Sequence, residues 1–122
     1  MTARVYKHLN NQGLYVFSLE GNFSSEKELN QLEECVSKTL ETPDLKGLVI
    51  SQEEEDLRIN SRGLTQIIFL LSKLDDRSKV ENKPKISFSN VKGKLKRLLE
   101  ISKLDKKYTQ YSSLEEAISS YQ

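Results

Sequence analysis

The stretch that decides the fold is GLVISQEEEDLRINSRGLTQIIFLL, residues 47–71. Residues 47–50 are continuously apolar, which is typical of a strand buried on both faces in the centre of a sheet. Residues 53–56 are four successive carboxylates that cannot be buried together, so they predict an exposed loop. The apolar residues that follow recur at helical spacing, and we expect the sheet to cover most of this helix; they are Leu64, Ile67, Ile68, Leu71 and Leu74. The segment therefore predicts a buried strand, a loop and a helix in succession.

The residues before this segment predict a hairpin and a helix. Residues 4–9 and 14–19 each alternate apolar and polar side chains, and residues 10–13 between them have the composition of a hairpin turn. Ser25 and Glu28 have the spacing of a capping box that begins a helix. The apolar face of this helix is supplied by Leu29, Leu32, Val36 and Leu40, and Thr42-Pro43 ends it.

The residues after the segment predict two more strands and two more helices. Residues 85–88 read as a fourth strand, and residues 91–99 as a third helix with apolar positions at helical spacing. Residues 108–111 predict a weak final strand, and Ser113 with Glu116 forms a second capping box before a short helix. The chain is thus expected to be one α/β domain over residues 1–122, with a mixed β-sheet of about five strands covered by about four helices.

Composition argues against several kinds of chemistry. The chain has 122 residues, of which 36% are hydrophobic and 30% charged, as in a soluble globular protein. Cys35 is the single cysteine, so an intrachain disulfide and a cysteine-based zinc site are excluded. His8 is the single histidine and the one candidate for a catalytic dyad or triad, but no serine or acid near it in the sequence suggests one, and we expect it to be a solvent-facing strand residue. The longest apolar run, residues 67–71, is too short to span a bilayer, and nothing resembles a signal peptide. We expect a cytoplasmic protein that is not an enzyme, inserts no helix into a membrane and needs no metal or cofactor.

Charge is distributed unevenly although the net charge is only +1. Residues 20–56 contain 11 acidic and 3 basic residues, whereas residues 79–107 contain 10 basic and 3 acidic residues. Such a layout can orient a charged protein partner, or it can simply describe two solvated surfaces. The basic set has no interleaved aromatic residues and no DNA-binding motif, so we expect no nucleic-acid binding; its members are Lys92, Lys94, Lys96, Arg97, Lys103, Lys106 and Lys107.

Ser61 occupies the junction between the loop and the apolar helix. A serine there can cap the helix, and it can also carry a phosphate beside free backbone N–H groups and the positive end of the helix dipole. The residues alone leave both interpretations open. Arg62 is expected to be exposed and able to pair with a phosphate or with an acidic group of a partner. Gly63 is expected to serve the helix entry, with close approach of a partner as the alternative.

Four segments carry a resemblance to a known family. Residues 59–64, INSRGL, are similar to the signature (I/M)-D-S-S-G-L of STAS domains, the fold of bacterial anti-sigma factor antagonists. Residues 86–91 (ISFSNV), 98–105 (LLEISKLD) and 111–118 (YSSLEEAI) resemble the way this family ends, from its fourth strand to its last helix. The resemblance extends over essentially the whole chain.

The resemblance implies a function for Ser61. In such antagonists this serine accepts phosphate from a partner that is both an anti-sigma factor and a serine kinase; the unphosphorylated form binds that kinase, phosphorylation dissociates the pair, and a phosphatase restores the cycle. The implied partner-binding surface around Ser61 comprises Asn60, Arg62, Gly63, Asn22, Phe23 and Ser24. This chain departs from the family at Asn60, where an aspartate is usual, and at Asn22 and Ser24, where the family often has acidic residues.

A second hypothesis keeps the fold and changes the partner. Stand-alone STAS domains also resemble small subunits that bind the ATPase of lipid-transport ABC systems. Loss of the acidic positions suits such a constitutive adaptor, in which Ser61 is only a helix cap. In either case we expect a monomer or a weak dimer, because a mixed sheet leaves an exposed edge strand.

Overall fold

The computed structural model describes residues 2–8, 13–23, 25–42, 45–53, 57–77 and 85–121. These residues form seven strands and five helices. The strands are β1 (Thr2–Lys7), β2 (Leu14–Glu20), β3 (Asn22–Phe23), β4 (Gly47–Gln52), β5 (Arg58–Ile59), β6 (Lys85–Ser89) and β7 (Thr109–Tyr111). The helices are α1 (Glu26–Leu40), α2 (Ser61–Arg77), α3 (Gly93–Ile101), α4 (Leu104–Lys107) and α5 (Leu114–Tyr121).

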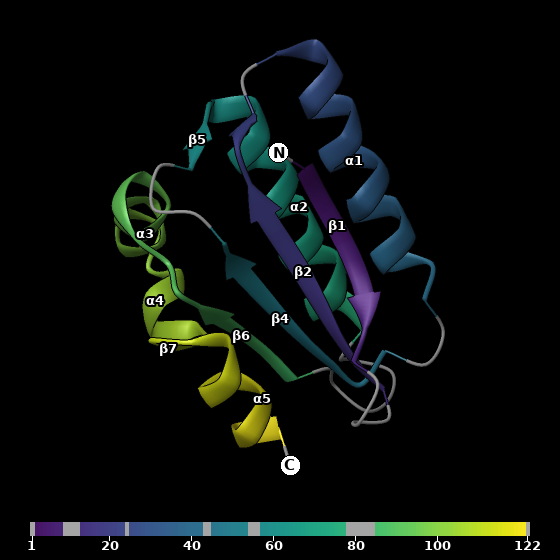
Figure 1. Ribbon diagram of the computed structural model, residues 1–122, viewed down its shortest axis with the longest axis vertical. Coiled ribbons are helices and arrows are strands. Elements are labelled where there is room, and N and C mark those ends of the chain that lie inside the picture. The colour runs from purple at the N-terminus through teal and green to yellow at the C-terminus, as the bar shows by residue number, and fades with distance from the viewer. Residues whose placement is uncertain are drawn as a thin grey trace.

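Five of the strands form one mixed sheet in the order β1-β2-β4-β6-β7 (Figure 1). β1 pairs with β2 in the antiparallel direction, and every other neighbouring pair is parallel. β4 lies in the centre with all six of its residues buried, which confirms the strand predicted from its continuous apolar run. The predicted α/β fold with a mixed sheet of five strands is confirmed.

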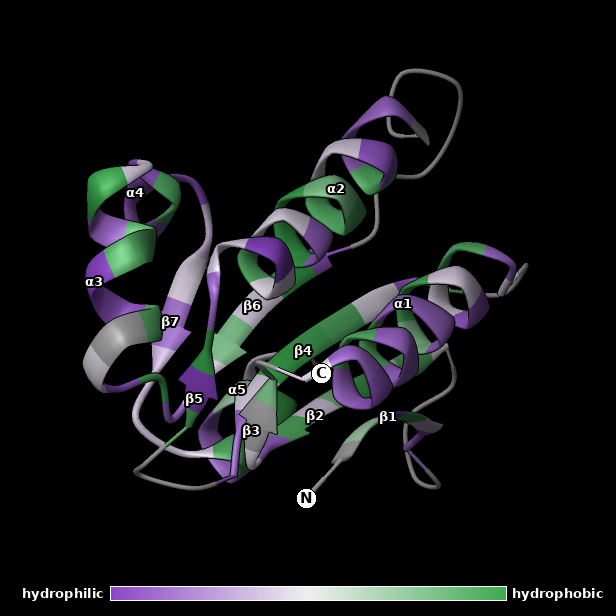
Figure 2. Cartoon of the chain, turned by 90° about the horizontal axis from the view of Figure 1, so that it is seen from above, coloured by the Kyte–Doolittle hydropathy of each residue, from purple (hydrophilic) through white to green (hydrophobic). Residues whose placement is uncertain are grey.

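Helices cover both faces of the sheet. Successive side chains of a strand point to opposite faces. On β4, Leu48 and Ile50 belong to the main core with α1, α2 and α3, whereas Val49 belongs to a smaller core with Ala117 of α5. α5 therefore covers the face opposite to α1, α2 and α3. In Figure 2, seen from above, β4 is largely hydrophobic while α1 carries hydrophilic residues along its length.

The two predicted capping boxes begin their helices. The hydroxyl of Ser25 accepts the backbone N–H of Glu28 at 3.4 Å and also contacts the Glu28 carboxylate. At the other end of the chain, the hydroxyl of Ser113 accepts the backbone N–H of Glu116 at 3.2 Å. Each serine thus satisfies one N–H group that has no partner inside the helix.

Four features differ from the sequence-based expectation. The two-residue strands β3 and β5 form a separate parallel pair, and the one-turn helix α4 adds a fifth helix. Tyr108 caps the end of α4 rather than starting the last strand, and its ring lies 6.1 Å from the ring of Phe88. On α2, Ile68 is 45% exposed, so the sheet covers less of this helix than its spacing predicted. The predicted turn residues 10–12 and carboxylates 54–56 lie outside the described residues.

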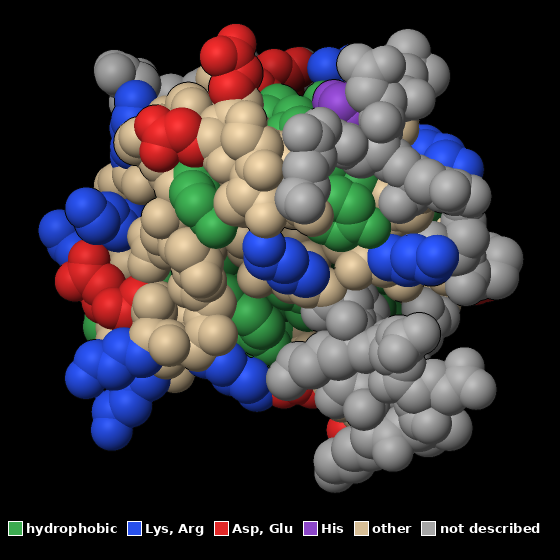
Figure 3. All heavy atoms as spheres, turned by 90° about the horizontal axis from the view of Figure 1, so that it is seen from below, with side chains coloured by type: hydrophobic (Ala, Val, Ile, Leu, Met, Phe, Trp, Pro, Cys, Tyr) green, Lys and Arg blue, Asp and Glu red, His purple; other side chains and the backbone are tan. Residues whose placement is uncertain are grey.

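The side chains described at the lower end of the molecule are both charged and hydrophobic. Figure 3 shows Lys and Arg side chains interspersed there with carboxylates, and the hydrophobic side chains drawn in colour form only small separate patches. Across the described ranges, no helix is both long enough and apolar enough to cross a bilayer.

Candidate functional site

Helices α1 and α2 begin side by side because the strands that precede them are paired. Phe23 of β3 pairs with Ile59 of β5, and both side chains are buried. The backbone N–H of Asn60 also donates to the carbonyl of Phe23 at 3.4 Å. Two residues of each chain segment are enough to fix the direction in which both helices leave. The two helix N-termini therefore lie at the same end of the molecule, at the top of Figure 1.

Gly63 permits the first turn of α2 to approach β5 and α1 closely. A Cβ atom at this position would lie 2.5 Å from Cγ1 of Ile59 and 3.6 Å from Cδ2 of Leu29. The first distance is far below van der Waals contact, so a larger residue would push Ile59 out of its place in the core. Gly63 is buried, and the structure gives it the packing role at the helix entry.

Asn60, and not Ser61, caps α2. The side-chain oxygen of Asn60 accepts the backbone N–H of Gly63 at 3.0 Å, and its carbonyl accepts the first helical hydrogen bond, from Leu64, at 3.1 Å. Asparagine is as good a cap as the aspartate of the family signature, so the substitution removes a charge and keeps the cap. The interpretation of Ser61 as the helix cap is wrong, because Ser61 is already the first helical residue.

The Ser61 side chain is exposed. Its hydroxyl makes no hydrogen bond with any other residue that the structure describes, while its carbonyl accepts the hydroxyl of Thr65 at 2.8 Å. The first turn of α2 contains no acidic residue that would oppose added negative charge. A phosphate on Ser61 would lie at the positive end of the helix dipole.

Arg62 forms an ion pair that crosses from α2 to α1. Its terminal nitrogen lies 3.2 Å from a carboxylate oxygen of Glu26, the first residue of α1. The two side chains are 66% and 70% exposed. Arg62 is therefore exposed as predicted, and it already has an acidic partner within the chain.

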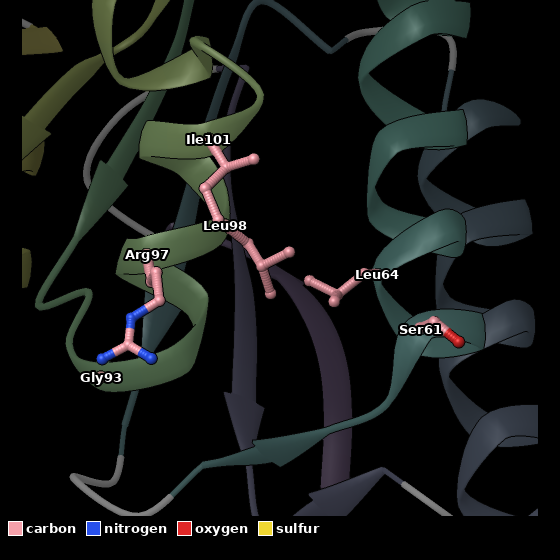
Figure 4. A pocket seen from close by; sticks show the side chains of 6 residues that line it. All are labelled: Ser61, Leu64, Gly93, Arg97, Leu98 and Ile101. Carbon is pink, nitrogen blue, oxygen red and sulfur yellow. The ribbon is translucent and has the colours of Figure 1, made fainter.

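An apolar groove of about 550 Å³ lies between α2 and α3 (Figure 4). Ser61 stands at its edge, Leu64 forms the α2 wall, and Leu98 with Ile101 forms the α3 wall. Ile101 is 72% exposed, which is unusual for so large an apolar side chain. Gly93, the first residue of α3, and Arg97, about one turn further along, complete the lining.

The groove is bordered by positive charge. The first turn of α3, like that of α2, contains no acidic residue. Arg97 is exposed and is the cation that lines the groove among the described residues. The N-terminal ends of two helices and this cation make the groove suited to a partner that is apolar and acidic.

A polar contact at the far end of α2 connects it to α4. The ammonium group of Lys107 pairs with the carboxylate of Asp75, and this hydrogen bond raises the pKa of Lys107. Burial raises the pKa of the adjacent Tyr108. The contact holds the α3–α4 segment against the end of α2 that is remote from Ser61.

The structure brings together most of the predicted site. Asn60, Ser61, Arg62 and Gly63 form the start of α2, and Phe23 lies buried behind them. Asn22 lies in β3, and Ser24 is outside the described residues. The sequence did not predict that Arg97, Leu98 and Ile101 line a groove beside Ser61. Ile101 continues the apolar spacing of α3 three positions after Leu98, and this spacing could have indicated it.

The described residues show no metal centre. No three His, Cys, Asp or Glu side chains among them are grouped as metal ligands would be. Cys35 is buried in α1, and burial raises the pKa of its thiol. Cys35 is thus a small residue of the main core.

Neither a family model nor a curated protein matches the sequence, whereas several solved structures match the fold. The Bacillus cell fate determinant SpoIIAA in its phosphorylated form superposes with a TM-score of 0.76 at 13% identity, covering 99% of this chain and 100% of that chain. The unphosphorylated anti-sigma factor antagonist SpoIIAA gives 0.70 at 11% identity, covering 98% and 96%.

A third solved structure is similar to the same extent. An anti-sigma factor antagonist from Mycobacterium paratuberculosis gives a TM-score of 0.69 at 20% identity, covering 98% of this chain and 92% of that chain. At these identities the likeness concerns the fold. The chain therefore has the STAS fold of the anti-sigma factor antagonists, as the resemblance in its sequence predicted.

Proposed function

We propose that this protein is a non-enzymatic regulator of the anti-sigma factor antagonist kind, which binds an anti-sigma serine kinase and is controlled by phosphorylation of Ser61. The observation that carries the proposal is the exposed hydroxyl of Ser61 at the first position of α2, where Asn60 already does the capping. A serine that the fold does not need for its cap is available for modification.

Phosphorylation of Ser61 by a kinase requires no catalytic group from this chain. The kinase would transfer the terminal phosphoryl group of ATP to the Ser61 oxygen, the hydroxyl proton would pass to a base of the kinase, and ADP would leave. The chain contributes an accessible hydroxyl and a helix N-terminus that tolerates the product. One of the solved structures with this fold is described as phosphorylated. These points support Ser61 as the acceptor.

The groove between α2 and α3 supports a protein partner beside Ser61. Its walls offer Leu64, Leu98 and Ile101, and Arg97 stands at its entrance. A partner segment with an apolar side chain for the groove and a carboxylate for Arg97 would match this surface. A phosphate of about −1.5 to −2 charge on Ser61 would lower the positive potential at the start of α2 and so weaken binding of that carboxylate.

Capture of the partner on variants of Ser61 tests the proposal. The wild-type chain and the variants Ser61→Ala, Ser61→Glu and Ser72→Glu would be immobilised, and bound proteins from the native host identified by mass spectrometry. Ser72 is exposed on the same helix, so Ser72→Glu adds the same charge three turns away. We expect a serine kinase to be retained by all chains except Ser61→Glu, and to phosphorylate the wild type but not Ser61→Ala.

The opposite result would favour the adaptor hypothesis. Equal retention of one partner, such as the ATPase of an ABC transporter, by wild type and Ser61→Glu would mean that charge at Ser61 does not control binding. Absence of phosphate on Ser61 after incubation with the retained protein and ATP would contradict the kinase assignment.

A further inference from the structure

The ion pair between Arg62 and Glu26 has a position that bears on Ser61. We propose that it is a charge latch: Glu26 holds Arg62 while Ser61 is unmodified, and a phosphate on Ser61 takes over Arg62 and releases the Glu26 carboxylate. This inference rests on the proposed function of Ser61 and concerns how that site responds to its modification. No position of the family signature supplies it, because the signature has a small residue where this chain has Arg62.

A phosphate on Ser61 would lie on the side of α2 that faces α1 and Glu26. Figure 4 shows the Ser61 hydroxyl directed away from Leu98 and Ile101, and therefore away from α3. α1 flanks α2 on its other side (Figure 1). Arg62 reaches toward that side, since its terminal nitrogen lies 3.2 Å from Glu26 of α1. A phosphate on Ser61 and the Arg62 guanidinium would then project into the same space.

The exchange of partners follows from the strengths of the two contacts. The Arg62–Glu26 pair is largely exposed, so water and salt screen it strongly. A phosphoserine offers about twice the charge of a carboxylate and three oxygens that suit the forked guanidinium. The phosphate is therefore the stronger competitor for Arg62.

Release of Glu26 has little cost to the fold. Glu26 lies in the first turn of α1, where the helix dipole favours a carboxylate with or without Arg62. The change at the surface is larger than the phosphate alone: the neutral pair is replaced by a phosphate bound to Arg62 and a separate, unpaired carboxylate. The latch thus spreads the added negative charge from α2 to α1.

A chain with phosphoserine installed at position 61 during translation tests the latch without any kinase. The ³¹P resonance would be followed against pH in the phosphorylated chain and its variants. We expect Arg62→Gln to raise the second pKa of the phosphate by about half a unit, since an exposed cation has been removed. Lys73→Gln is the matched control, because Lys73 is an exposed cation three turns further along α2; it should leave that pKa unchanged.

Variants of Glu26 show whether Glu26 and the phosphate compete for Arg62 or whether Arg62 only attracts the phosphate. In the Glu26→Gln background Arg62 has no other acidic partner among the residues that the structure describes. Arg62→Gln should therefore raise the pKa of the phosphate more than it does in the wild type. Glu34→Gln, which removes an exposed carboxylate further along α1, should not change the effect of Arg62→Gln. Arg58 of β5 and Arg97 of α3 are also cations near the start of α2, and both are kept in every variant.

Two results would overturn the latch. One is an effect of Arg62→Gln no larger than that of Lys73→Gln, which would mean that Arg62 does not bind the phosphate. The other is an equal effect of Arg62→Gln with and without Glu26, which would mean that Glu26 does not compete. Neither result depends on a kinase, so failure of the latch is distinct from failure of the proposed function, which appears in the capture experiment.

Discussion

The two long helices of this protein, α1 and α2, begin side by side, but their first turns differ in charge and in exposed side chains. α1 has its cap, Ser25, engaged with Glu28, and carries acidic residues in its first turn. α2 has its cap, Asn60, engaged with Gly63, carries no acidic residue in its first turn, and leaves the Ser61 side chain exposed. Both ends are well capped, and only α1 supplies its own negative charge.

This difference separates stability from function. The capping hydrogen bonds of α1 and α2 come from Ser25 and Asn60, so the cap of α2 does not need the Ser61 side chain. The unmet electrostatic preference of the α2 N-terminus is for an anion, which the proposed phosphate would provide. The following predictions test the comparison, beginning with the largest effect.

The largest effect is expected in the groove between α2 and α3, where we expect the partner to bind. Ile101→Ala removes an apolar side chain from the groove, and we expect it to weaken binding of the captured kinase by roughly tenfold or more, from about 1.5 kcal/mol of lost burial. Because Ile101 is exposed, the free energy of unfolding should change little. The measurement is calorimetric titration of the purified pair.

Phe69→Ala is the control for this prediction. Phe69 is also exposed on α2, at 47%, but it lines a different groove with Val36 of α1. Its replacement should leave kinase binding unchanged. Loss of binding with Phe69→Ala and not with Ile101→Ala would place the partner on the α1 side of α2.

The second prediction tests the close approach of the two helix N-termini. Gly63→Ala introduces a Cβ that overlaps Ile59, and we expect a loss of about 1–2 kcal/mol in the free energy of unfolding, even though alanine itself favours a helix. Urea denaturation measures it, with Ser72→Ala on the exposed face of α2 as the control. A stabilised Gly63→Ala variant would contradict the packing role of Gly63.

The third prediction tests the assignment of the caps. Asn60→Ala and Ser25→Ala should each lower the free energy of unfolding by about 1 kcal/mol, because each leaves a backbone N–H of a first turn without its partner. Ser61→Ala should change it by less than about 0.5 kcal/mol, as at an ordinary surface position. The reverse order, with Ser61→Ala more damaging than Asn60→Ala, would restore Ser61 as the cap.

The smallest expected effect concerns the buried side of α1. Burial raises the pKa of the Cys35 thiol above its ordinary value of 9.0, so above that pH the unfolded chain loses this proton before the folded chain does. The contribution of Cys35 is therefore present below pH 9.0 and is lost as the pH rises. We expect the free energy of unfolding to fall less steeply above pH 9.0 in Cys35→Ala than in the wild type, measured by urea denaturation. Parallel profiles for the two chains would contradict it.

Sequence patterns predicted the elements that have a period or a cap. The hairpin, the central strand β4 and both capping boxes each depend on residues close together in the chain, such as Ser25 with Glu28. The strands β3 and β5 were not predicted, because a strand of two residues is too short to show alternating apolar and polar side chains. They form because β2 and β4 bring them together. The one-turn helix α4 is equally too short to show a helical period.

The site was predicted in part for the same reason. Asn60 and Ser61 are adjacent and both suit a cap, so sequence alone could not assign the cap to Asn60. The pairing of Arg62 with Glu26 joins residues 36 positions apart, and the groove requires α3 to lie beside α2. Such features depend on tertiary packing, which no local pattern encodes.

The most direct test of the account is the affinity of the captured kinase for the chain with and without phosphate on Ser61, measured by calorimetry on purified proteins. We expect the phosphorylated chain to bind at least about tenfold more weakly, a difference of about 1.4 kcal/mol. Equal affinities of the two forms would contradict phosphorylation of Ser61 as the control of binding.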